Sequence, residues 1–308
     1  MKLFIRQAFF FVIPIALLLI SIEYTIRQIP NDYSYKNNYL NNNSENIKIL
    51  VLGNSHSFYG INPDYFSKHA FNAAYVSQSL KYDLFILNKY KNRLNSLNTL
   101  VLPISYFTLF SQLENGIEDW RTKNYMIYYG CHYHYDLKYN LEIIGSAPSL
   151  VFKKIYQFFK RKNFITVSEL GFGLAYSNSK QSDLIATGFE AARRHTTSNL
   201  DLLGTNLLLL NELIERCKVK GINIILFTPP ARKSYTSNLN KHQLAVMKST
   251  INKIVQENSN VLYLDFMNDN RFVDDDFQDA DHLNGIGAKK LTQLIDQIII
   301  DQPKISQH

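Results

Sequence analysis

Short runs of apolar residues, each bounded by polar or turn-forming residues, recur along the chain. Uninterrupted runs of this length are typical of strands that are buried on both faces, as in a parallel sheet. The sequence therefore predicts strands at residues 47–53, 99–105, 222–229 and 260–266, with a shorter candidate at residues 70–76.

Longer stretches with an apolar residue every three or four positions lie between these runs and predict helices. In residues 199–221 the apolar stripe ends at Gly221, a residue type that commonly terminates a helix. The other helical patterns cover residues 79–94, 240–258 and 283–300. This alternation predicts an α/β fold with a parallel sheet covered by helices on both faces. Right-handed crossovers place the carboxyl ends of all strands at one edge, where sites form.

The first residues of the chain are strongly apolar. Residues 7–22 carry no charge, and Lys2 and Arg6 precede them. This pattern is typical of an uncleaved signal anchor, so we expect residues 1–28 to form a single transmembrane helix. Basic residues on its amino-terminal side place the rest of the chain outside the cytoplasmic (inner) membrane. A cleaved signal peptide and a buried soluble helix are the alternatives, although no small-residue cleavage site is present.

The region after the apolar stretch is polar and rich in Asn, which predicts a linker over residues 29–46. A folded domain is expected over residues 47–308. An aromatic-rich insertion at about 106–198 interrupts it and lacks a buried-strand pattern. We expect this insertion to be mostly helical and to cap the carboxyl ends of the strands, because a structureless loop of that length is uncommon.

One helical pattern within the insertion is strongly amphipathic. Residues 150–162 place Phe152, Ile155 and Phe159 on one face and basic residues elsewhere. Such a helix most often packs its apolar stripe on its own domain, which is our expectation here. The alternative is a helix that lies on a membrane surface.

Composition narrows the range of partners. The chain has 308 residues, of which 46% are apolar and 19% charged, as in a globular domain. Its net charge of +7 comes from scattered Lys and Arg. No nucleic-acid partner is expected, although acidic polymers or anionic lipids would suit this charge. The two cysteines, Cys131 and Cys217, cannot build a cysteine zinc site, and they could either form one disulfide or remain buried thiols.

Ser55 follows the first predicted strand and Gly53, at the edge where sites form. Alone, it could equally be a nucleophile or a serine that caps the next helix. Asp279 and His282 are three positions apart and follow the last predicted strand. A tight turn would let Asp279 hold the His282 ring while the other ring nitrogen acts as a base. With Asp279 and His282 at the same edge, the nucleophile interpretation is favoured.

The segments GNSHSFYG and DADHLN resemble the first and last sequence blocks of the SGNH (GDSL-like) serine hydrolases and acyltransferases. The layout is similar to their membrane-anchored branch, which is associated with bacterial cell-envelope polymers. The resemblance covers roughly residues 47–300. It implies a flavodoxin-like three-layer α/β/α fold with five parallel strands. It also implies that Ser55 is the nucleophile, His282 the general base and Asp279 its orienting acid, with no cofactor.

The middle blocks depart from the family pattern at the oxyanion donors. Ser77 stands where the family has a glycine with a donating backbone N–H, in a block that opens with Asn72. The Asn of the third block is missing, and Ser105 is its nearest match. Loss of one such donor costs roughly 10²–10³-fold in rate in other enzymes. Either Asn54, Ser105 or a residue of the insertion replaces it, or the chain is slow or inactive.

The remaining polar clusters are weaker candidates. His56 adjoins Ser55 and is expected to point away from it. His132 and His134 could ligate a metal, but no third ligand has a fitting spacing, so no metal site is predicted. Residues 192–195, ARRH, could bind an anionic group on a substrate, although a solvated helix face is the commoner interpretation.

These observations predict an extracytoplasmic, membrane-anchored serine esterase or O-acyltransferase that acts on acyl esters, acetyl esters among them, of a cell-envelope polysaccharide. The expected partners are that glycan, the membrane through the N-terminal helix, and in one alternative a membrane protein. A non-catalytic polysaccharide-binding or assembly protein is the rival interpretation. A metal hydrolase that uses His132, His134 and the acidic segment before His282 is the third.

Overall fold

Two compact units make up the chain in the computed structural model, which describes residues 1–160, 162–177 and 180–301. The first unit contains Met1–Asn38 and Ile117–Ile165, and the second contains Tyr39–Gly116 and Thr166–His308. Ser55, Asp279 and His282 all belong to the second unit.

The second unit is built on a five-stranded sheet whose strands all run parallel, in the order β2-β1-β3-β4-β5. This is the order of flavodoxin-like folds, in which ligands bind beyond the carboxyl ends of the strands. Each predicted apolar run forms one strand, so the predicted fold class is confirmed. The strands are β1 Ile49–Val51, β2 Ala70–Asn72, β3 Thr99–Pro103, β4 Asn223–Thr228 and β5 Val261–Asp265.

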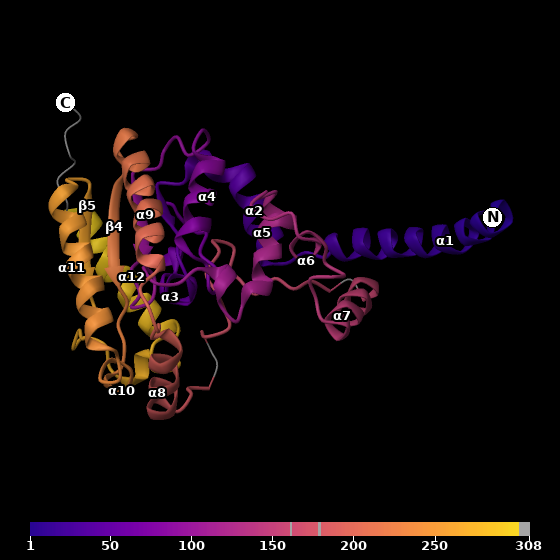
Figure 1. Ribbon diagram of the computed structural model, residues 1–308. Helices are drawn as coiled ribbons and strands as arrows, with labels where there is room; N and C mark the ends of the chain where they lie inside the picture. The colour runs from indigo at the N-terminus through magenta and orange to yellow at the C-terminus, as the bar shows by residue number, and fades with distance from the viewer. Residues whose placement is uncertain (161, 178–179, 302–308) are drawn as a thin grey trace. The chain divides into compact units, whose positions relative to one another are not determined.

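Helices flank this sheet. The helices of the second unit are α3 Ser55–Gly60, α4 Leu80–Tyr90, α8 Leu184–His195, α9 Leu202–Val219, α10 Lys233–Thr236, α11 Lys241–Glu257 and α12 Gly285–Asp301, with 3₁₀ turns at Ser44–Asn46, Pro63–Tyr65, Leu113–Asn115 and Asp274–Asp276. Strands β4 and β5 of this sheet are labelled in Figure 1, beside helices α9, α11 and α12. Helix α3 packs against α12, α4 against α9, and α8 against α10. Helix α9 ends just before Gly221, as predicted. Gly221 adopts the left-handed conformation (φ +67°), which glycine accommodates best.

Alternate strand residues point to opposite faces of the sheet and are buried on both. One buried cluster joins strand residues to α12 and consists of Ile49, Val51, Val101, Ile225, Phe227, Leu291, Ile295 and Ile299 with their neighbours. The intervening residues Leu50, Leu100 and Leu226 are also fully buried. Burial on both faces explains why the strands are uninterrupted apolar runs in the sequence.

The first unit begins with α1 (Lys2–Arg27). Among the described residues, α1 alone is long and apolar enough to cross a membrane, by its length and composition over Leu3–Arg27. The other helices of this unit are α5 Thr122–Tyr129, α6 Leu137–Asn140 and α7 Pro148–Phe159, with a 3₁₀ turn at Asp119–Arg121. Helix α2 (Asp32–Asn43) contains the boundary between the units.

The polar segment expected to be a linker is instead helical. The Asn31 side chain accepts hydrogen bonds from the N–H groups of Tyr33 and Ser34, which caps the start of α2. Tyr33 is buried and packs edge-on against Tyr125. The linker prediction failed because the residues that α2 buries, Tyr33, Lys36 and Leu40, form no aliphatic stripe in the sequence.

The amphipathic stripe of residues 150–162 also differs from expectation. Phe152 and Phe159 are 72% and 75% exposed, so the prediction that they pack on the domain is wrong. Of this stretch, Arg161 lies outside the described residues. The central part of the aromatic insertion, Ile117–Ile165, groups with Met1–Asn38, whereas the part from Thr166 onward belongs with the sheet.

No disulfide joins the two cysteines. The side chains of Cys131 and Cys217 are both buried thiols. Of the two alternatives left open by the sequence, the structure has buried thiols.

The turn from β1 into α3 requires a glycine. Gly53 has φ +108°, a conformation that side chains disfavour. A Cβ added there would lie 2.2 Å from Cδ of Pro103, at the end of the neighbouring strand β3. The position of Ser55 therefore depends on close packing of two strand ends.

Gly53→Ala should lower the free energy of unfolding by about 3 kcal/mol, since left-handed strain and overpacking each cost about 1–2 kcal/mol or more. Urea unfolding of the full chain in mild detergent, followed by circular dichroism, measures it. Gly204→Ala, within α9, is the matched control, because a Cβ there meets nothing within 4 Å. The control should be neutral or stabilising by up to about 1 kcal/mol. Equal shifts in the two variants would contradict the packing argument.

Candidate active site

Ser55 is the first residue of α3, directly beyond the carboxyl end of β1. Asn54 is the N-cap of that helix, and its side chain accepts a hydrogen bond from the N–H of His56 at 3.0 Å. The Ser55 side chain is half-buried. Its backbone N–H has no acceptor among the hydrogen bonds of the described residues, as expected for the first turn of a helix.

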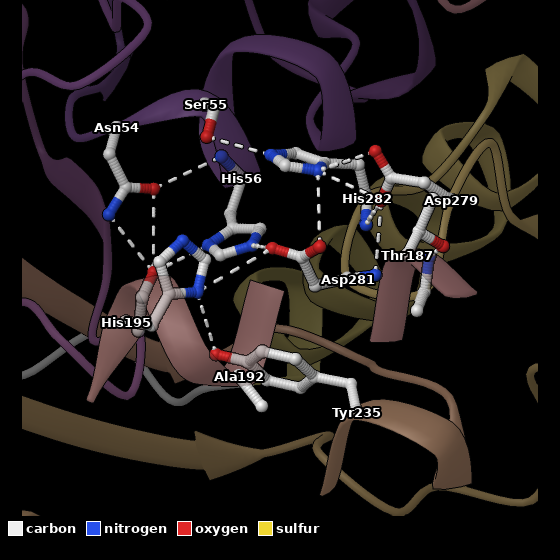
Figure 2. Close-up of polar contacts among 12 residues, drawn as sticks. Asn54, Ser55, His56, Thr187, Ala192, His195, Tyr235, Asp279, Asp281 and His282 are labelled. Atoms are coloured by element: carbon white, nitrogen blue, oxygen red, sulfur yellow. Dashed lines mark hydrogen bonds and ion pairs between the residues drawn. The ribbon is translucent and has the colours of Figure 1, made fainter. Parts of the chain in front are cut away.

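The structure brings the side chains of Ser55, His282 and Asp279 together (Figure 2). Nε2 of His282 lies 2.8 Å from Oγ of Ser55, and its Nδ1 lies 3.0 and 3.1 Å from the two carboxylate oxygens of Asp279. The carboxylate also accepts the backbone N–H groups of Asp281 and His282, which closes the tight turn. With Nδ1–H donating to Asp279, neutral His282 presents a free Nε2 lone pair to the serine hydroxyl.

A second carboxylate, Asp281, lies beside the same histidine. Its side chain is 2% exposed, and Figure 2 shows it between the rings of His56, His195 and His282. Oδ1 lies 3.6 Å from Nδ1 of His282, while Oδ2 lies 3.3 Å from Nε2 of His56 and 3.8 Å from Nδ1 of His195. The sequence analysis missed this residue, although it stands within the DADHLN segment.

His56 points away from Ser55, as expected, and links Asp281 to the base of α3. Its Nδ1 lies 2.7 Å from Oγ of Ser105, whose hydroxyl in turn accepts from Nδ2 of Asn54 at 3.0 Å. One assignment satisfies every group: His56 Nε2–H donates to Asp281, and the Ser105 hydroxyl donates to His56 Nδ1. The His56 ring also stacks on His282, with centroids 4.8 Å apart.

The side chains predicted to supply oxyanion donors are engaged elsewhere. Asn54 and Ser105 are 3% and 0% exposed and bond to each other. Asn72, fully buried, donates to the carbonyls of Ser57 and Ile61, each at 2.8 Å. The structure therefore gives these side chains a role in holding α3 and its neighbours. Ser77, the position that replaces the family glycine, has φ +60°, so a glycine-like backbone is retained there.

Asp83, on α4, forms hydrogen bonds to two loops of the site. Its Oδ1 accepts the N–H of Gly53 at 2.7 Å and Nε2 of Gln78 at 2.6 Å. One carboxylate thus holds both the turn before Ser55 and the residue after Ser77. Burial raises the pKa of Asp83 to about 7, and the hydrogen bonds from Gln78 and Gly53 only partly oppose this.

Two tyrosines that the sequence did not single out lie beside His282. Tyr59 and Tyr176 stack with ring centroids 4.0 Å apart, and each presents an edge to the His282 ring. Tyr176 belongs to a segment that lies along α3, where the N–H of Gly173 donates to the Phe58 carbonyl at 2.9 Å. A Cβ at Gly173 would lie 2.4 Å from the Phe58 ring. This close approach fixes the aromatic pair next to the site.

The buried charges shift the pKa of each histidine differently. Burial lowers the pKa of His56, and that of His195 to about 3, so both are neutral near pH 7. Burial acts in the same direction on His282, but the charges of Asp281 and Asp279 outweigh it and raise its pKa to about 9. The pKa of Asp281 is lowered, because the charge of His282 and the hydrogen bond from His56 outweigh its burial. His282 is therefore protonated at rest near neutral pH, and it becomes a base as the pH rises toward 9.

His56, Asp281 and His282 could in principle ligate a metal, since their ligand atoms lie within 4.8 Å of one another. A metal would have to replace the bonds from His56 to Asp281 and from His282 to Ser55 or Asp279. The donors and acceptors already pair completely, so this set fits a hydrogen-bonded network better. His132 and His134 belong to no group of three or more such ligands among the described residues.

The ARRH segment ends α8 and is only partly a solvated face. Arg193 is exposed and pairs with Glu190 at 2.8 Å. His195, by contrast, is 13% exposed, faces Asp281, and bonds through Nδ1 to the Tyr235 hydroxyl at 2.9 Å. The expectation of a solvated face is wrong for His195, because Ala191 and Ala192 turn this side of the helix inward.

No protein-family model and no curated protein sequence matches the chain. Several solved structures do match the chain. One, described provisionally as a platelet activating factor from Streptococcus pneumoniae, is 11% identical with a TM-score of 0.45, over 94% of this chain and 97% of its own. A lipolytic protein of the G-D-S-L family from Desulfitobacterium hafniense, also a provisional description, is 12% identical with a TM-score of 0.41, over 82% and 99%.

A third solved structure, described provisionally as an acylhydrolase from Bacteroides fragilis, is 14% identical with a TM-score of 0.38, over 85% of this chain and 94% of its own. The G-D-S-L family is the one that the two sequence blocks resemble. At these identities and TM-scores the likeness establishes no activity, and the function has to be inferred from the residues of this chain.

Asp83→Asn should reduce the loss of stability that accompanies rising pH. The folded protein keeps the Asp83 proton until about pH 7, whereas the unfolded chain loses it near 3.8. Stability from this group is therefore fully present below 3.8 and is lost as the pH rises through 7, at about 1.4 kcal/mol per unit. Asn keeps an oxygen for both hydrogen bonds and does not titrate. Urea unfolding at about pH 5 and about pH 8.5 measures the difference, and an unchanged pH dependence in the variant would contradict it.

Asp281→Asn should move the acid limb of the pH profile of kcat/KM from about 9 toward the ordinary histidine value of 6.5, because one of two carboxylates that stabilise protonated His282 is removed. Hydrolysis of a soluble aryl ester over a pH series measures it. Asp279→Asn is the comparison, since it also removes the acceptor of Nδ1–H and should lower kcat by about 10⁴-fold, as in other triads. An acid limb unmoved in Asp281→Asn would show that Asp281 does not act on His282.

Proposed function

We propose that this chain is a membrane-anchored serine esterase or O-acyltransferase that acts outside the cytoplasmic membrane on acyl esters of a cell-envelope polysaccharide. The observation that carries the proposal is the hydrogen-bonded series Ser55, His282 and Asp279, with heavy-atom distances of 2.8 and 3.0 Å. A nucleophile, its base and an orienting acid need this spacing.

In the proposed reaction, Ser55 Oγ attacks the ester carbonyl carbon as His282 Nε2 takes the hydroxyl proton. Asp279 holds the imidazolium that forms. Collapse of the tetrahedral intermediate breaks the bond to the alcohol oxygen, which leaves with the proton from His282, and an acyl-serine remains. Attack by water then gives hydrolysis, and attack by a sugar hydroxyl gives transfer of the acyl group. His282 accepts the proton of either nucleophile and returns it to Ser55.

The oxyanion is proposed to bind to backbone donors. The N–H of Ser55 points from the first turn of α3, where the helix dipole also favours negative charge. Ser77 is the proposed second donor, since the loop that carries it is held by the same Asp83 carboxylate as Gly53. With Ser105 bonded inward, no side-chain donor from the third block is added. A slow enzyme is expected.

The location and the substrate class rest on other features. The length and apolar character of α1 support an anchor. The resemblance of GNSHSFYG and DADHLN to the envelope branch of the SGNH hydrolases supports an acylated glycan. The stacked pair Tyr59 and Tyr176 offers aromatic surface beside Ser55, of the kind on which sugar rings pack.

A binding or assembly protein is the second candidate, and the inward bonds of Asn54 and Ser105 favour it. Such a protein would keep the site geometry and bind glycan without turnover. Its signature would be polymer binding that persists in Ser55→Ala while the parent chain shows no esterase activity.

A fluorophosphonate probe should label the full chain at Ser55, and Ser55→Ala should remove the label. Labelling should be about tenfold or more faster near pH 9.5 than near pH 7, because neutral His282 is needed. Ser57→Ala is the matched control: Ser57 lies on the same helix, is buried, has no hydrogen bond to its hydroxyl, and should label like the parent. Folded protein that shows no Ser55-dependent label at high pH would refute the catalytic proposal and favour the binding one.

A further inference from the structure

Helix α7 turns an aromatic face outward. Phe152, Tyr156 and Phe159 follow one another at intervals of four and three residues, so they share one side of the helix. They are 72%, 59% and 75% exposed, and no residue of α7 is buried. Monomeric soluble proteins seldom expose adjoining large rings of this kind.

The opposite side of α7 is bound to the rest of its unit by an ion pair. Nζ of Lys154 lies 2.9 Å from Glu142, whose side chain is 0% exposed and also pairs with the buried Lys123 at 3.0 Å. The Tyr128 hydroxyl donates to the other carboxylate oxygen at 2.8 Å. Burial would raise the pKa of Glu142, but the charges of Lys154 and Lys123 lower it to about 2. This network fixes the rotation of the helix, so the rings face outward because the polar side is tied down.

Helix α7 lies next to α1, the candidate membrane helix. The two helices pack against each other. Near the end of α1, Glu23 accepts the N–H groups of Glu142 and Ile143, and Arg27 donates to the Asn140 carbonyl. A largely apolar cavity of about 360 Å³ lies at this junction. Glu23 and Arg27 line it together with Leu19, Ile20, Tyr24, Leu141, Ile143 and Ile144. Apolar surface thus continues from α1 toward α7.

The charges beside the exposed rings are all positive. Lys153 and Lys160 are exposed and flank the aromatic face, and α7 contains no Asp or Glu. Aromatic rings with lysines beside them are the composition of helices that lie in the interface of anionic membranes. Each lysine near such a surface is attracted electrostatically to the anionic headgroups.

We propose that α7 is an interfacial helix that lies in the headgroup region of an anionic bilayer, with Phe152, Tyr156 and Phe159 inserted and α1 crossing the same bilayer beside it. The proposal shares with the proposed function only the placement of α1 in a membrane, and it is independent of the chemistry at Ser55. The aromatic face of α7 is thus proposed to contact lipid and not a protein partner.

Quenching of an indole at position 156 by lipids with brominated acyl chains tests the proposal. The variant is Tyr156→Trp in a Trp120→Phe background, since the chain has one Trp. The full chain is reconstituted into lipid discs made with phosphatidylglycerol. Brominated lipid should lower the fluorescence about twofold or more, because interfacial helices bury their apolar face at the acyl boundary.

Leu208→Trp in the same background is the matched control, because Leu208 on α9 is 73% exposed, about as much as the rings of α7, and belongs to the other unit. It should show no quenching. Absence of quenching at 156, equal quenching at both positions, or failure of the full chain to enter discs would each overturn the proposal. In phosphatidylcholine discs, or with Lys153→Gln and Lys160→Gln together, quenching at 156 should fall; no change would overturn the assignment of anionic lipid.

The same sample separates this proposal from the catalytic one. Ser55→Ala should leave quenching at 156 unchanged, because the residue lies in the second unit. Phe152→Ser with Phe159→Ser should remove the lipid contact while fluorophosphonate labelling of Ser55 persists. If fluorophosphonate did not label Ser55 while lipid still quenched the indole at position 156, only the catalytic proposal would be refuted.

Discussion

The candidate site depends on one negative charge that is kept away from water. An isolated carboxylate as buried as Asp281 would cost several kcal/mol, and the charge of His282 and the hydrogen bond from His56 offset that cost. The consequences spread outward through hydrogen bonds. His56 is oriented by Asp281, Ser105 by His56, and Asn54 by Ser105. Asn54 caps the helix that begins with Ser55. The position of the serine and the basicity of His282 are thus both set from the same carboxylate.

Much of this arrangement could be predicted from local sequence signals. The strands are buried on both faces, so they can be recognised in the sequence as apolar runs. Because the carboxyl ends of parallel strands share an edge, Ser55, Asp279 and His282 could be predicted to lie close together. Asp281 could not be found in this way. Nothing in DADHLN distinguishes a buried carboxylate from a solvated one, because its burial depends on His56 and His195, which are distant in the sequence. Helix α2 was missed for a related reason, since the residues that it buries, Tyr33, Lys36 and Leu40, form no aliphatic stripe.

The departures from the family pattern acquire a physical meaning in the structure. Ser105 occupies the position of the expected side-chain donor, yet its hydroxyl bonds to His56 and Asn54. A residue that would stabilise a transition state instead stabilises the buried network. Catalytic power and rigidity of the site therefore compete for the same position.

The segment that carries Tyr176 has a second consequence, at the border of the sheet. Strand β2 is an edge strand, and the N–H of its residue Asn72 is bonded to the Leu170 carbonyl at 2.9 Å. Unpaired edges are templates for strand addition by other molecules, and proteins protect them with loops laid across them. The stretch from Leu170 to Tyr176 closes part of this edge and also forms the wall beside His282. A change that loosens it would expose the chain to self-association at the same time as it opens the site.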